Sequence, residues 1–509
     1  MKILQIGQTD LRSEVKLEQS TKWEFWEVEQ IAEFLVPYNL PKKPARFNFA
    51  AVIFTSTVPA ESLKMLQKFL QAYRVVILAG VQLPELVARY SAWQVTQEQL
   101  PHFVKDIERD FFLSQYGDNA AIESVEVARS FQGDIKYRGR HQLELTGDFG
   151  TEFKPIATFK RGFYISEKNS IELWPVFEKS AAIELKFVVR LAHVGDIEIQ
   201  KTLEFSKAQL DEPLILEGLD GNATATVSIW AKGQGTLVLG NINNRLTRHQ
   251  YGTLIMGGQR FADHKRQEFF YYFDPGNLKP PLTVYFAGWQ PRTGFEGYFM
   301  MKRLGHPFIL FADPRLEGGS FYLGSAEYEA KIKAVIEESL AKLGVTNKEL
   351  VLSGISMGTT GAIYYGSKIG ARAVIVGKPL INLGTIALNN TLHRANEFDT
   401  ALDLLLLQQG KNSAKAATEF DQRMLQALKN SQLTAGQVLA AYMREDDYDG
   451  TAFHDLVENL QADQVKVIGH GYTGRHNDAS NKVIAWFLKQ YELLLQEFER
   501  KGQDETDQR

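Results

Sequence analysis

Residues 349–362 read ELVLSGISMGTTGA, an apolar run followed by a glycine-flanked serine and then by small residues. The run predicts a buried strand, and the residues from Thr359 onward predict a helix. A Gly-x-Ser-x-Gly motif between a strand and a helix is typical of a nucleophile elbow, a strained turn that exposes the serine hydroxyl. The motif also arises by chance as an ordinary glycine-flanked turn. Its placement favours the functional interpretation, so we predict that Ser356 is a nucleophile.

A serine nucleophile needs a base, because its hydroxyl is otherwise inert. In α/β hydrolases the serine, the acid and the histidine follow one another along the chain. His476 lies in a glycine-rich loop after the last expected strand and before a final amphipathic helix at 479–498. We therefore predict His476 as the base. His470 is the alternative, and its position nearer the strand end favours a structural role.

The acid is expected after the strand at 438–443, where residues 444–449 read REDDYD. An acid at this place would orient His476 and stabilise the imidazolium that forms during catalysis. We favour Asp446, with Asp447 and Glu445 as alternatives. The other carboxylates of the cluster are expected to form a solvated acidic loop.

An oxyanion hole requires backbone N–H groups that point at the developing negative charge. One donor is expected from Met357, directly after the nucleophile. The other is expected from the loop that follows an early strand, where Gly288 and Trp289 are the candidates. A plain loop with an apolar tryptophan is an equally good interpretation of that segment. The loop at 313–320 follows another strand at the same edge and is expected to shape the pocket.

Apolar strands alternate with helical stretches from about residue 251 to residue 500, which predicts a parallel sheet with right-handed crossovers. The expected strands are 269–273, 282–287, 308–311, 349–353, 373–376, 438–442 and 465–468. Two expected helices, 396–407 and 414–428, interrupt this order within a helical insertion at 383–433. We predict an α/β-hydrolase-type catalytic domain at 251–500 that carries this insertion, followed by a frayed, charged tail at 501–509.

The first 115 residues also alternate between strands and helices. Strands are expected at 2–6, 23–28, 51–57 and 75–79, and a helix at 60–73. The last two strands are continuous apolar runs, as in buried parallel sheets. This pattern predicts a Rossmann-like α/β domain. Since its first strand is not followed by a Gly-x-Gly-x-x-Gly motif, we assign it no dinucleotide.

The segment at 116–250 has the alternating pattern of short strands. Apolar-polar alternation occurs at 183–191, 197–203, 223–231 and 236–239, with turn signals at 220–222 and 233–235. This spacing predicts a central β-sandwich. Trp174 and Trp230 would stack on sugar rings if exposed, so that a carbohydrate-binding-like domain is one interpretation. A place in the core of the sandwich is the favoured one.

Composition excludes several classes of function. The chain has no cysteine, which excludes disulfides, thiolate catalysis and cysteine-ligated metals. A net charge of −4 gives no indication of nucleic-acid binding. The opening residues form too short an apolar run for a signal peptide, and no window is long enough to span a membrane. No P-loop, His-Glu-x-x-His or EF-hand motif is present, so no metal is expected. These features favour a soluble, intracellular, multidomain protein.

The opening residues 1–7, the elbow at 354–358 and the acidic block at 442–453 resemble the second accessory secretion proteins of the accessory Sec system of streptococci and related Gram-positive bacteria. The resemblance covers essentially the whole chain, and its motifs are specific in combination. That family resembles carbohydrate O-acetyltransferases and esterases with a Ser–acid–His triad. By position, Ser356 matches the nucleophile and His476 the base. The acid falls within 445–447, where the family also uses glutamate, so the individual acid stays open.

The resemblance implies an O-acetyltransferase that acts on N-acetylglucosamine residues of serine-rich-repeat adhesin glycoproteins in the cytoplasm. The implied partners are two other accessory secretion proteins and the accessory SecA motor, which adds a peripheral location at the membrane translocase. It also implies a part in export that does not depend on acetyl transfer. No bound cofactor is implied, but an acetyl donor is required. The donor, the sugar hydroxyl that is modified and the stoichiometry of the partner complex stay open.

Two further functions remain open. An esterase of the same fold would remove acetyl groups with the same machinery, because hydrolysis and transfer differ in whether water is excluded and the sugar is held. A non-catalytic export scaffold would use the N-terminal parts of the chain to contact its partners.

Overall fold

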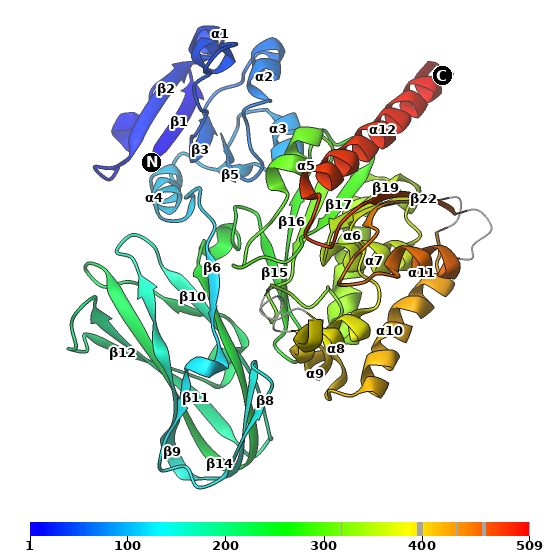
Figure 1. Ribbon diagram of the computed structural model, residues 1–509. Coiled ribbons are helices and arrows are strands. Elements are labelled where there is room, and N and C mark those ends of the chain that lie inside the picture. The colour runs from blue at the N-terminus through cyan, green and yellow to red at the C-terminus, as the bar shows by residue number, and fades with distance from the viewer. Residues whose placement is uncertain (317, 394–400, 434–435, 461–464, 508–509) are drawn as a thin grey trace. The chain divides into compact units, whose positions relative to one another are not determined.

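The computed structural model describes residues 1–316, 318–393, 401–433, 436–460 and 465–507 (Figure 1). The chain divides into two compact units. The first unit consists of Met1–Gln115 together with the later segments Thr247–Gln259 and Tyr272–Leu278. The second unit consists of Tyr116–Leu246, Arg260–Tyr271 and Lys279–Arg509, and therefore holds the β-rich segment and the region around Ser356 together.

The first unit contains a five-stranded parallel sheet with the order β2-β1-β3-β4-β5. Its strands are β1 (Lys2–Gly7), β2 (Lys22–Glu27), β3 (Ala51–Phe54), β4 (Val75–Leu78) and β5 (Trp93–Val95). Its helices are α1 (Ile31–Phe34), α2 (Ala60–Leu66), α3 (Pro84–Tyr90) and α4 (Leu100–Asp110). All four residues of β3 are buried, which explains its uninterrupted apolar sequence. The helix expected to extend to residue 73 ends at Leu66.

Two side chains explain why a segment far along the chain belongs to the first unit. The Arg248 guanidinium donates to the backbone carbonyls of Asp110, Phe112 and Ser114. The Tyr251 hydroxyl donates to Asp106 Oδ2 at 2.6 Å and is buried. Burial lowers the pKa of Arg248 to about 9, which leaves the side chain charged at neutral pH. The carbonyl oxygens stabilise this buried charge.

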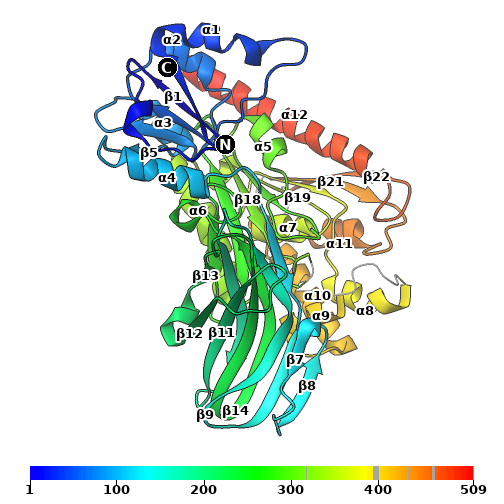
Figure 2. The ribbon, with the colours of Figure 1, turned by 90° about the vertical axis from the view of Figure 1, so that its left-hand side faces the viewer.

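The β-rich part of the second unit is a sheet of nine strands with antiparallel pairing throughout. The strands are β6 (Gly117–Ala120), β7 (Val125–Val127), β8 (Asp134–Arg138), β9 (Gln142–Ile165), β10 (Ile171–Lys179), β11 (Glu184–His193), β12 (Lys201–Ser206), β13 (Leu214–Leu216) and β14 (Ala223–Leu246). Figure 2 shows β9 and β14 as long strands that run side by side along this part. Apolar side chains from both strands meet in a single core.

The expected turn at 233–235 is not a turn but part of β14. The register between β14 and β9 shifts between Ala231 and Gly233 and again between Gly233 and Gln234. Gly233 has φ of +100°, and a Cβ there would lie 2.0 Å from the carbonyl oxygen of Ala182. The glycines therefore mark β-bulges that bend a continuous strand, and they do not end it.

Neither tryptophan of this part is an open sugar platform. Trp174 is only 3% exposed and lies between the guanidinium groups of Arg260 and Arg266, 3.9 and 3.7 Å from its ring centroid. Trp230 is half-buried, has the Lys186 ammonium over its ring, and donates to the Ser228 hydroxyl at 3.1 Å. Trp174 is buried, as the favoured interpretation expected, and cationic side chains lie over the rings of both tryptophans.

The remaining sheet has eight strands in the order β15-β16-β18-β17-β19-β20-β21-β22. They are β15 (Gln259–Ala262), β16 (Glu268–Asp274), β17 (Leu282–Phe286), β18 (Phe308–Ala312), β19 (Leu350–Ile355), β20 (Ala373–Gly377), β21 (Gln437–Met443) and β22 (Lys466–Tyr472). The strands from β18 to β22 in this order pair in parallel. Their carboxyl ends consequently share one edge, where the loops after β17, β19, β21 and β22 meet. The fold is thus a mixed α/β fold with parallel and antiparallel sheets.

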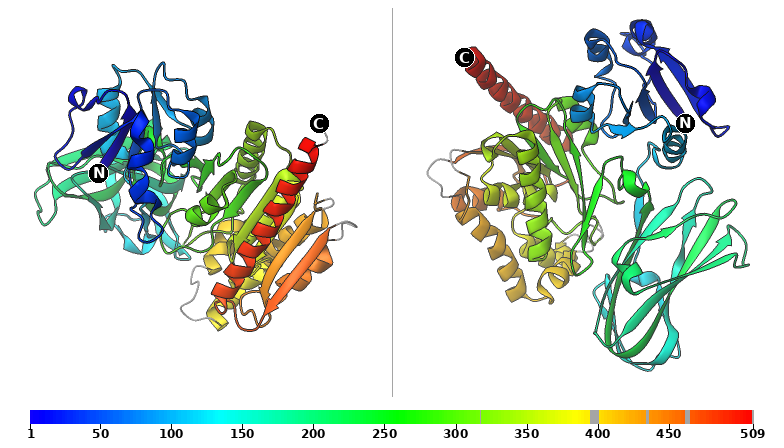
Figure 3. Two further views of the ribbon diagram at one scale, coloured as in Figure 1. Left: turned by 90° about the horizontal axis from the view of Figure 1, so that it is seen from above. Right: turned by 180° about the vertical axis from the view of Figure 1, so that it is seen from behind.

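Helices cover this sheet on both faces (Figure 3). They are α5 (Tyr298–Leu304), α6 (Ala326–Leu343), α7 (Gly358–Ile369), α11 (Ala452–Asn459) and α12 (Ser480–Asp507). On one face, α12 contacts β20 and β21, and its buried Tyr491 donates to the Ser353 hydroxyl of β19 at 2.6 Å. The helix continues to Asp507, through most of the tail expected to be frayed at 501–509.

The helical insertion contains α8 (Leu383–His393), α9 (Ala401–Gln409) and α10 (Ala414–Lys429). The first part of the helix expected at 396–407 lies outside the described residues. Asp421 of α10 accepts hydrogen bonds from the backbone N–H groups of Gly384 and Thr385, in the first turn of α8. A carboxylate at a helix N-terminus satisfies free N–H groups and the helix dipole, so this contact holds α8 and α10 together.

Candidate active site

Ser356 occupies the turn between β19 and α7 with φ of +55°. A non-glycine residue in this left-handed region is strained, and such strain is concentrated at functional sites. The Ser356 N–H donates to the carbonyl of Gly377 at 2.8 Å, and its own carbonyl accepts from the Thr359 hydroxyl at 2.6 Å. The backbone on both sides of the serine is therefore held in the strained conformation.

The two glycines of the motif are required for close backbone packing. A Cβ on Gly354 would lie 2.3 Å from the carbonyl carbon and oxygen of Gly358. A Cβ on Gly358 would lie 2.0 Å from the carbonyl oxygen of Phe286 in β17. Any larger residue at either position would push α7 away from the sheet and move the serine.

Ser356, His476 and Asp446 form a hydrogen-bonded series. Ser356 Oγ lies 2.8 Å from His476 Nε2, and His476 Nδ1 lies 2.9 Å from Asp446 Oδ2. The side chains of His476 and Asp446 are each only 4% exposed. The ring of Tyr448 packs on the imidazole with a centroid distance of 4.5 Å. In this order the imidazole can accept the serine proton, and the carboxylate can stabilise the charge that results.

Each carboxylate of the acidic cluster has a different contact. Asp446 contacts the imidazole, and it also accepts from the N–H groups of Tyr448 and Asp449 at 2.9 and 3.2 Å. Asp447 Oδ1 accepts the backbone N–H of His476 at 3.0 Å. Glu445 accepts the N–H of Gly474, in the loop before the histidine. Of the three candidate acids, Asp446 is thus the one whose carboxylate is within hydrogen-bond distance of a ring nitrogen of His476.

The fourth carboxylate of the cluster, Asp449, is buried rather than solvated. It accepts the backbone N–H groups of Ile381 and Asn382 at 2.7 and 2.8 Å. Burial raises its pKa above the ordinary value, and the hydrogen bonds from Asn382 and Ile381 oppose that shift. Asp449 therefore connects the loop after β21 to the segment that leads into α8 and is not part of a solvated loop, whereas Glu445 is exposed.

The predicted oxyanion-hole residues lie around the elbow. Met357 precedes the first residue of α7 and is buried. The Gly288 N–H is already donated to Glu296 Oε2 at 2.7 Å. Trp289 is 46% exposed and packs over Gly318, where a Cβ would lie 2.0 Å from its ring. All three residues therefore lie near the elbow, but the Gly288 N–H is hydrogen-bonded to the Glu296 carboxylate.

Two ionisable side chains near the site, the half-buried Glu296 and the buried Lys378, escaped the sequence analysis. Burial raises the pKa of Glu296, while hydrogen bonds from Gly288, Tyr285 and Gln290 oppose that shift. Lys378, directly after β20, is 4% exposed, and it donates to the Ser480 hydroxyl at 2.9 Å. Burial lowers the pKa of Lys378. The one sequence signal for Lys378 is its position after a parallel strand, at the edge where Ser356 lies. No short motif indicates Glu296.

The alternative histidine, His470, lies within β22 and is exposed. Its ring packs against Tyr472 and stacks with Trp486, at centroid distances of 4.6 and 6.2 Å. Within the described part of the chain, no group of three or more histidine, aspartate or glutamate residues is arranged to hold a metal ion. A search of the same residues found no helix long and apolar enough to cross a bilayer.

Comparisons with known proteins agree over the whole chain. A family model described as an "Accessory Sec system GspB-transporter" matches residues 1–500. An accessory Sec system protein of Staphylococcus aureus (strain NCTC 8325 / PS 47), accessory secretory protein 2, is 37% identical over 508 residues, covering 97% of both chains. The protein of the same name from Streptococcus gordonii is 36% identical over 513 residues, covering 98% of this chain and 99% of the relative.

A solved structure agrees with these matches. A chain of the "Glycosylation Associate Protein (Gap123) complex from Streptococcus agalactiae" superposes with a TM-score of 0.88 and 34% identity. The superposition covers 97% of this chain and 98% of that chain. The similarity therefore extends over both units, and not only over the region around Ser356.

Proposed function

The chain belongs to the family of accessory secretory protein 2 of the accessory Sec system, and we propose that it is an O-acetyltransferase that works through an acyl-enzyme on Ser356. The family resemblance inferred from the sequence motifs is confirmed by these matches. The observation that carries the proposed activity is the series Ser356–His476–Asp446, with contacts of 2.8 and 2.9 Å, at a strained strand-to-helix turn. The order of the eight-stranded sheet supports an α/β-hydrolase-type catalytic domain.

The proposed reaction has two steps. In the first, Ser356 Oγ attacks the carbonyl carbon of the acetyl donor while His476 Nε2 accepts the hydroxyl proton, and Asp446 stabilises the imidazolium through Nδ1–H. The bond to the donor's leaving group breaks, and the leaving group takes the proton from His476. In the second, a sugar hydroxyl gives its proton to His476 and attacks the acyl carbon. The ester bond to Ser356 breaks, and the proton returns to the serine.

Backbone N–H groups are proposed to stabilise the oxyanion of both tetrahedral intermediates. Met357 supplies one donor. Gly288 is a poor choice for the second donor in this conformation, because its N–H is hydrogen-bonded to Glu296. We place the second donor at Trp289, the next residue of the same loop.

The proposed acceptor is N-acetylglucosamine on serine-rich-repeat adhesin glycoproteins, modified in the cytoplasm at the export machinery. The proposed partners are two other accessory secretion proteins, and the accessory SecA motor at the membrane. The similarity to a chain of the Gap123 complex supports the first of these partnerships. The proposed reaction also requires an acetyl donor.

A fluorophosphonate probe, which reacts covalently with activated serines, tests the nucleophile directly. Wild type should be labelled at Ser356, whereas Ser356→Ala and His476→Ala should not be. His470→Ala is the matched control, because it removes the other histidine of the same segment without touching the serine, and it should label like wild type. Absence of labelling in the folded wild-type protein would contradict an activated serine and leave the scaffold function.

The acetyl content of the adhesin in cells that carry Ser356→Ala separates transfer from hydrolysis. We expect it to fall, because the enzyme would no longer add acetyl groups. A rise would identify the esterase instead. Unchanged acetyl content with impaired export would identify a scaffold.

A further inference from the structure

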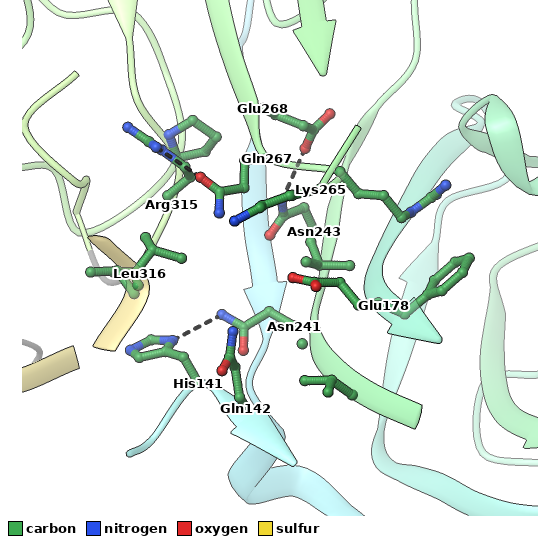
Figure 4. A pocket seen from close by; sticks show the side chains of 17 residues that line it. His141, Gln142, Glu178, Asn241, Asn243, Lys265, Gln267, Glu268, Arg315 and Leu316 are labelled. Atoms are coloured by element: carbon green, nitrogen blue, oxygen red, sulfur yellow. Dashed lines mark hydrogen bonds between the residues drawn. The ribbon is translucent and has the colours of Figure 1, made fainter. Parts of the chain in front are cut away.

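A cavity of about 70 Å³ lies in the second unit, where β10 and β14 meet β16 and the loop after β18 (Figure 4). A cavity needs about 10–15 Å³ for each buried water, and each water displaces about 30 Å³ of liquid. The cavity therefore has room for several water molecules, and the exposed side chains of Glu178 and Lys265 in its lining leave it open on one side. Ser356, His476 and Asp446 do not line this cavity.

Three buried polar atoms among the lining residues have no hydrogen-bond partner within the described structure. They are His141 Nε2, Asn241 Oδ1 and Arg266 Nη2. His141 Nε2 lies 3.7 Å from Asp403 Oδ2, which is too far for a hydrogen bond. Asn241 Nδ2 lies 3.2 Å from His141 Nδ1, so these two side chains hold each other. Burial lowers the pKa of His141 to about 4, which leaves the imidazole neutral in the cell. A buried polar atom without a partner is costly, and these atoms therefore call for a polar occupant.

The rest of the lining indicates the chemistry of that occupant. Glu178 and Lys265 are exposed at the cavity and have opposite charges, and Gln142 and Gln267 add amide groups. Figure 4 shows Gln267 and Lys265 facing His141, Gln142 and Asn241 across one space. Leu316, Leu407 and Phe177 supply apolar wall. The buried Arg315 and Glu268 of the lining are already paired, Arg315 with Asp313 and Glu268 with Arg245 and Arg260. Paired charges, amide and imidazole groups beside apolar surface suit a neutral ring with many hydroxyls better than an anion.

We infer that this cavity is a saccharide-binding subsite that holds one sugar unit of the acceptor glycan. The inference rests on the proposed function, since it assigns a place to the acceptor of that reaction. The loop after β18 connects the two sites. Pro314 and Leu316 line the cavity, whereas Gly318 and Gly319 pack against Trp289 and Met357 beside the nucleophile. A glycan seated in the cavity would thus contact the loop that borders Ser356.

Binding of N-acetylglucosamine and its β-linked dimer to the full-length chain, followed by saturation-transfer NMR and calorimetry, tests this subsite. The measurement uses a Ser356→Ala background, so that it does not depend on acetyl transfer. We expect saturable binding that Asn241→Ala weakens at least about tenfold, because the side chain supplies a buried hydrogen-bonding group. Asn244→Ala is the matched control: it removes a buried asparagine of the same strand that does not line the cavity, and binding should be unchanged.

Thermal unfolding shows whether each variant is folded. If Asn241→Ala does not fold, Lys265→Ala at the exposed side of the cavity takes its place and should weaken binding about threefold. The inference is overturned if the sugars do not bind saturably, which means that only water fills the cavity, or if both variants bind like the control. It is also overturned if a serine-rich peptide without sugar competes for the cavity. Sugar binding by a chain that fails the fluorophosphonate test would support the subsite and contradict the enzyme.

Discussion

At the scale of single residues, the carboxylates after β21 show how similar side chains in one short segment acquire different tasks. Asp446 and Asp447 are adjacent, yet one contacts the His476 ring and the other its backbone N–H. Both contacts hold the histidine, but only the ring contact would act on the imidazolium charge of the proposed reaction. The two contacts therefore make different contributions, which substitution can separate.

Asp446→Asn should lower kcat by roughly 10³–10⁴-fold, because the amide keeps the shape but holds the wrong tautomer of His476 and loses the charge. Asp447→Asn should cost only about five- to tenfold, since it weakens one backbone hydrogen bond worth about 1 kcal/mol. The measurement is p-nitrophenyl acetate turnover by the purified protein. Similar losses in the two variants would contradict the assignment of Asp446 as the acid.

Glu296 is expected to act as a positioning residue for the oxyanion loop, because it accepts the Gly288 N–H and also bonds to the Gln290 side chain. Glu296→Ala should lower kcat for p-nitrophenyl acetate by about 10–100-fold, with a smaller change in KM, because the loop loses its fixed orientation. Glu296→Gln keeps an acceptor and should restore most of the activity. A glutamine variant as slow as the alanine variant, or an alanine variant as fast as wild type, would contradict this role.

At the scale of elements, the elbow depends on how closely α7 approaches β17. Gly358→Ala should destabilise the protein by roughly 3 kcal/mol or more, because the new Cβ would lie 2.0 Å from the carbonyl oxygen of Phe286. Gly366→Ala is the comparison variant on the same helix and should cost less, since its Cβ would lie 2.7 Å from a side-chain methyl of Val374, which can shift, and would meet no backbone atom. Denaturant unfolding measures both. Equal stabilities would show that α7 can move away from the sheet.

A second contact between elements should depend on pH. Asp403 of α9 accepts the Arg140 N–H of the turn before β9, and burial raises its pKa to about 6. A raised pKa means that folding favours the protonated acid. This contribution to stability is present below the ordinary pKa of the group and is lost as the pH rises through about 6. The folded state is therefore more stable in acid because Asp403 is buried, whereas the hydrogen bond from the Arg140 N–H favours the ionised carboxylate and opposes this shift.

Asp403→Asn removes this titration, so the stability of the variant relative to wild type should increase between pH 4 and pH 7. The expected change is on the order of 1–3 kcal/mol. Urea unfolding of both proteins at each pH measures it. A difference that is the same at both pH values would show that Asp403 is ionised throughout this range.

At the scale of the whole molecule, the first unit takes two segments from beyond residue 246. Removal of residues 1–115 should therefore leave the remainder with Arg248, Tyr251 and Met256 stripped of their buried surroundings. We expect the shortened chain to aggregate or to melt at a clearly lower temperature, because the apolar surfaces of Tyr251 and Met256 would be exposed to water.

Light scattering and thermal unfolding measure this effect. Co-expression with residues 1–115 as a separate chain is the control and should restore solubility. A shortened chain that is monomeric and as stable as the full-length protein would contradict the interleaved organisation of the first unit.

The sequence predicted most strands to within a few residues, because buried parallel strands and the alternating strands of the β-rich segment carry their own patterns. It misread the glycines at 233–235 as a turn, since a bulge and a turn both need glycine at positive φ. It also ended the last helix too early, because exposed helix and frayed tail have similar polar sequences. In both cases the same local sequence fits two structures, and only contacts with distant residues decide between them.

The sequence by itself determined the elbow around Ser356, because a strand, two glycines and a helix follow one another within fourteen residues and their steric demands are local. It also determined the family, since the match extends over residues 1–500. Only the tertiary structure decided which carboxylate contacts His476, because Asp446 and His476 come from different loops whose approach depends on the register of β21 against β22. It alone revealed the contact of Glu296 with the Gly288 N–H and the polar cavity beside β14, since no short sequence motif encodes either of them.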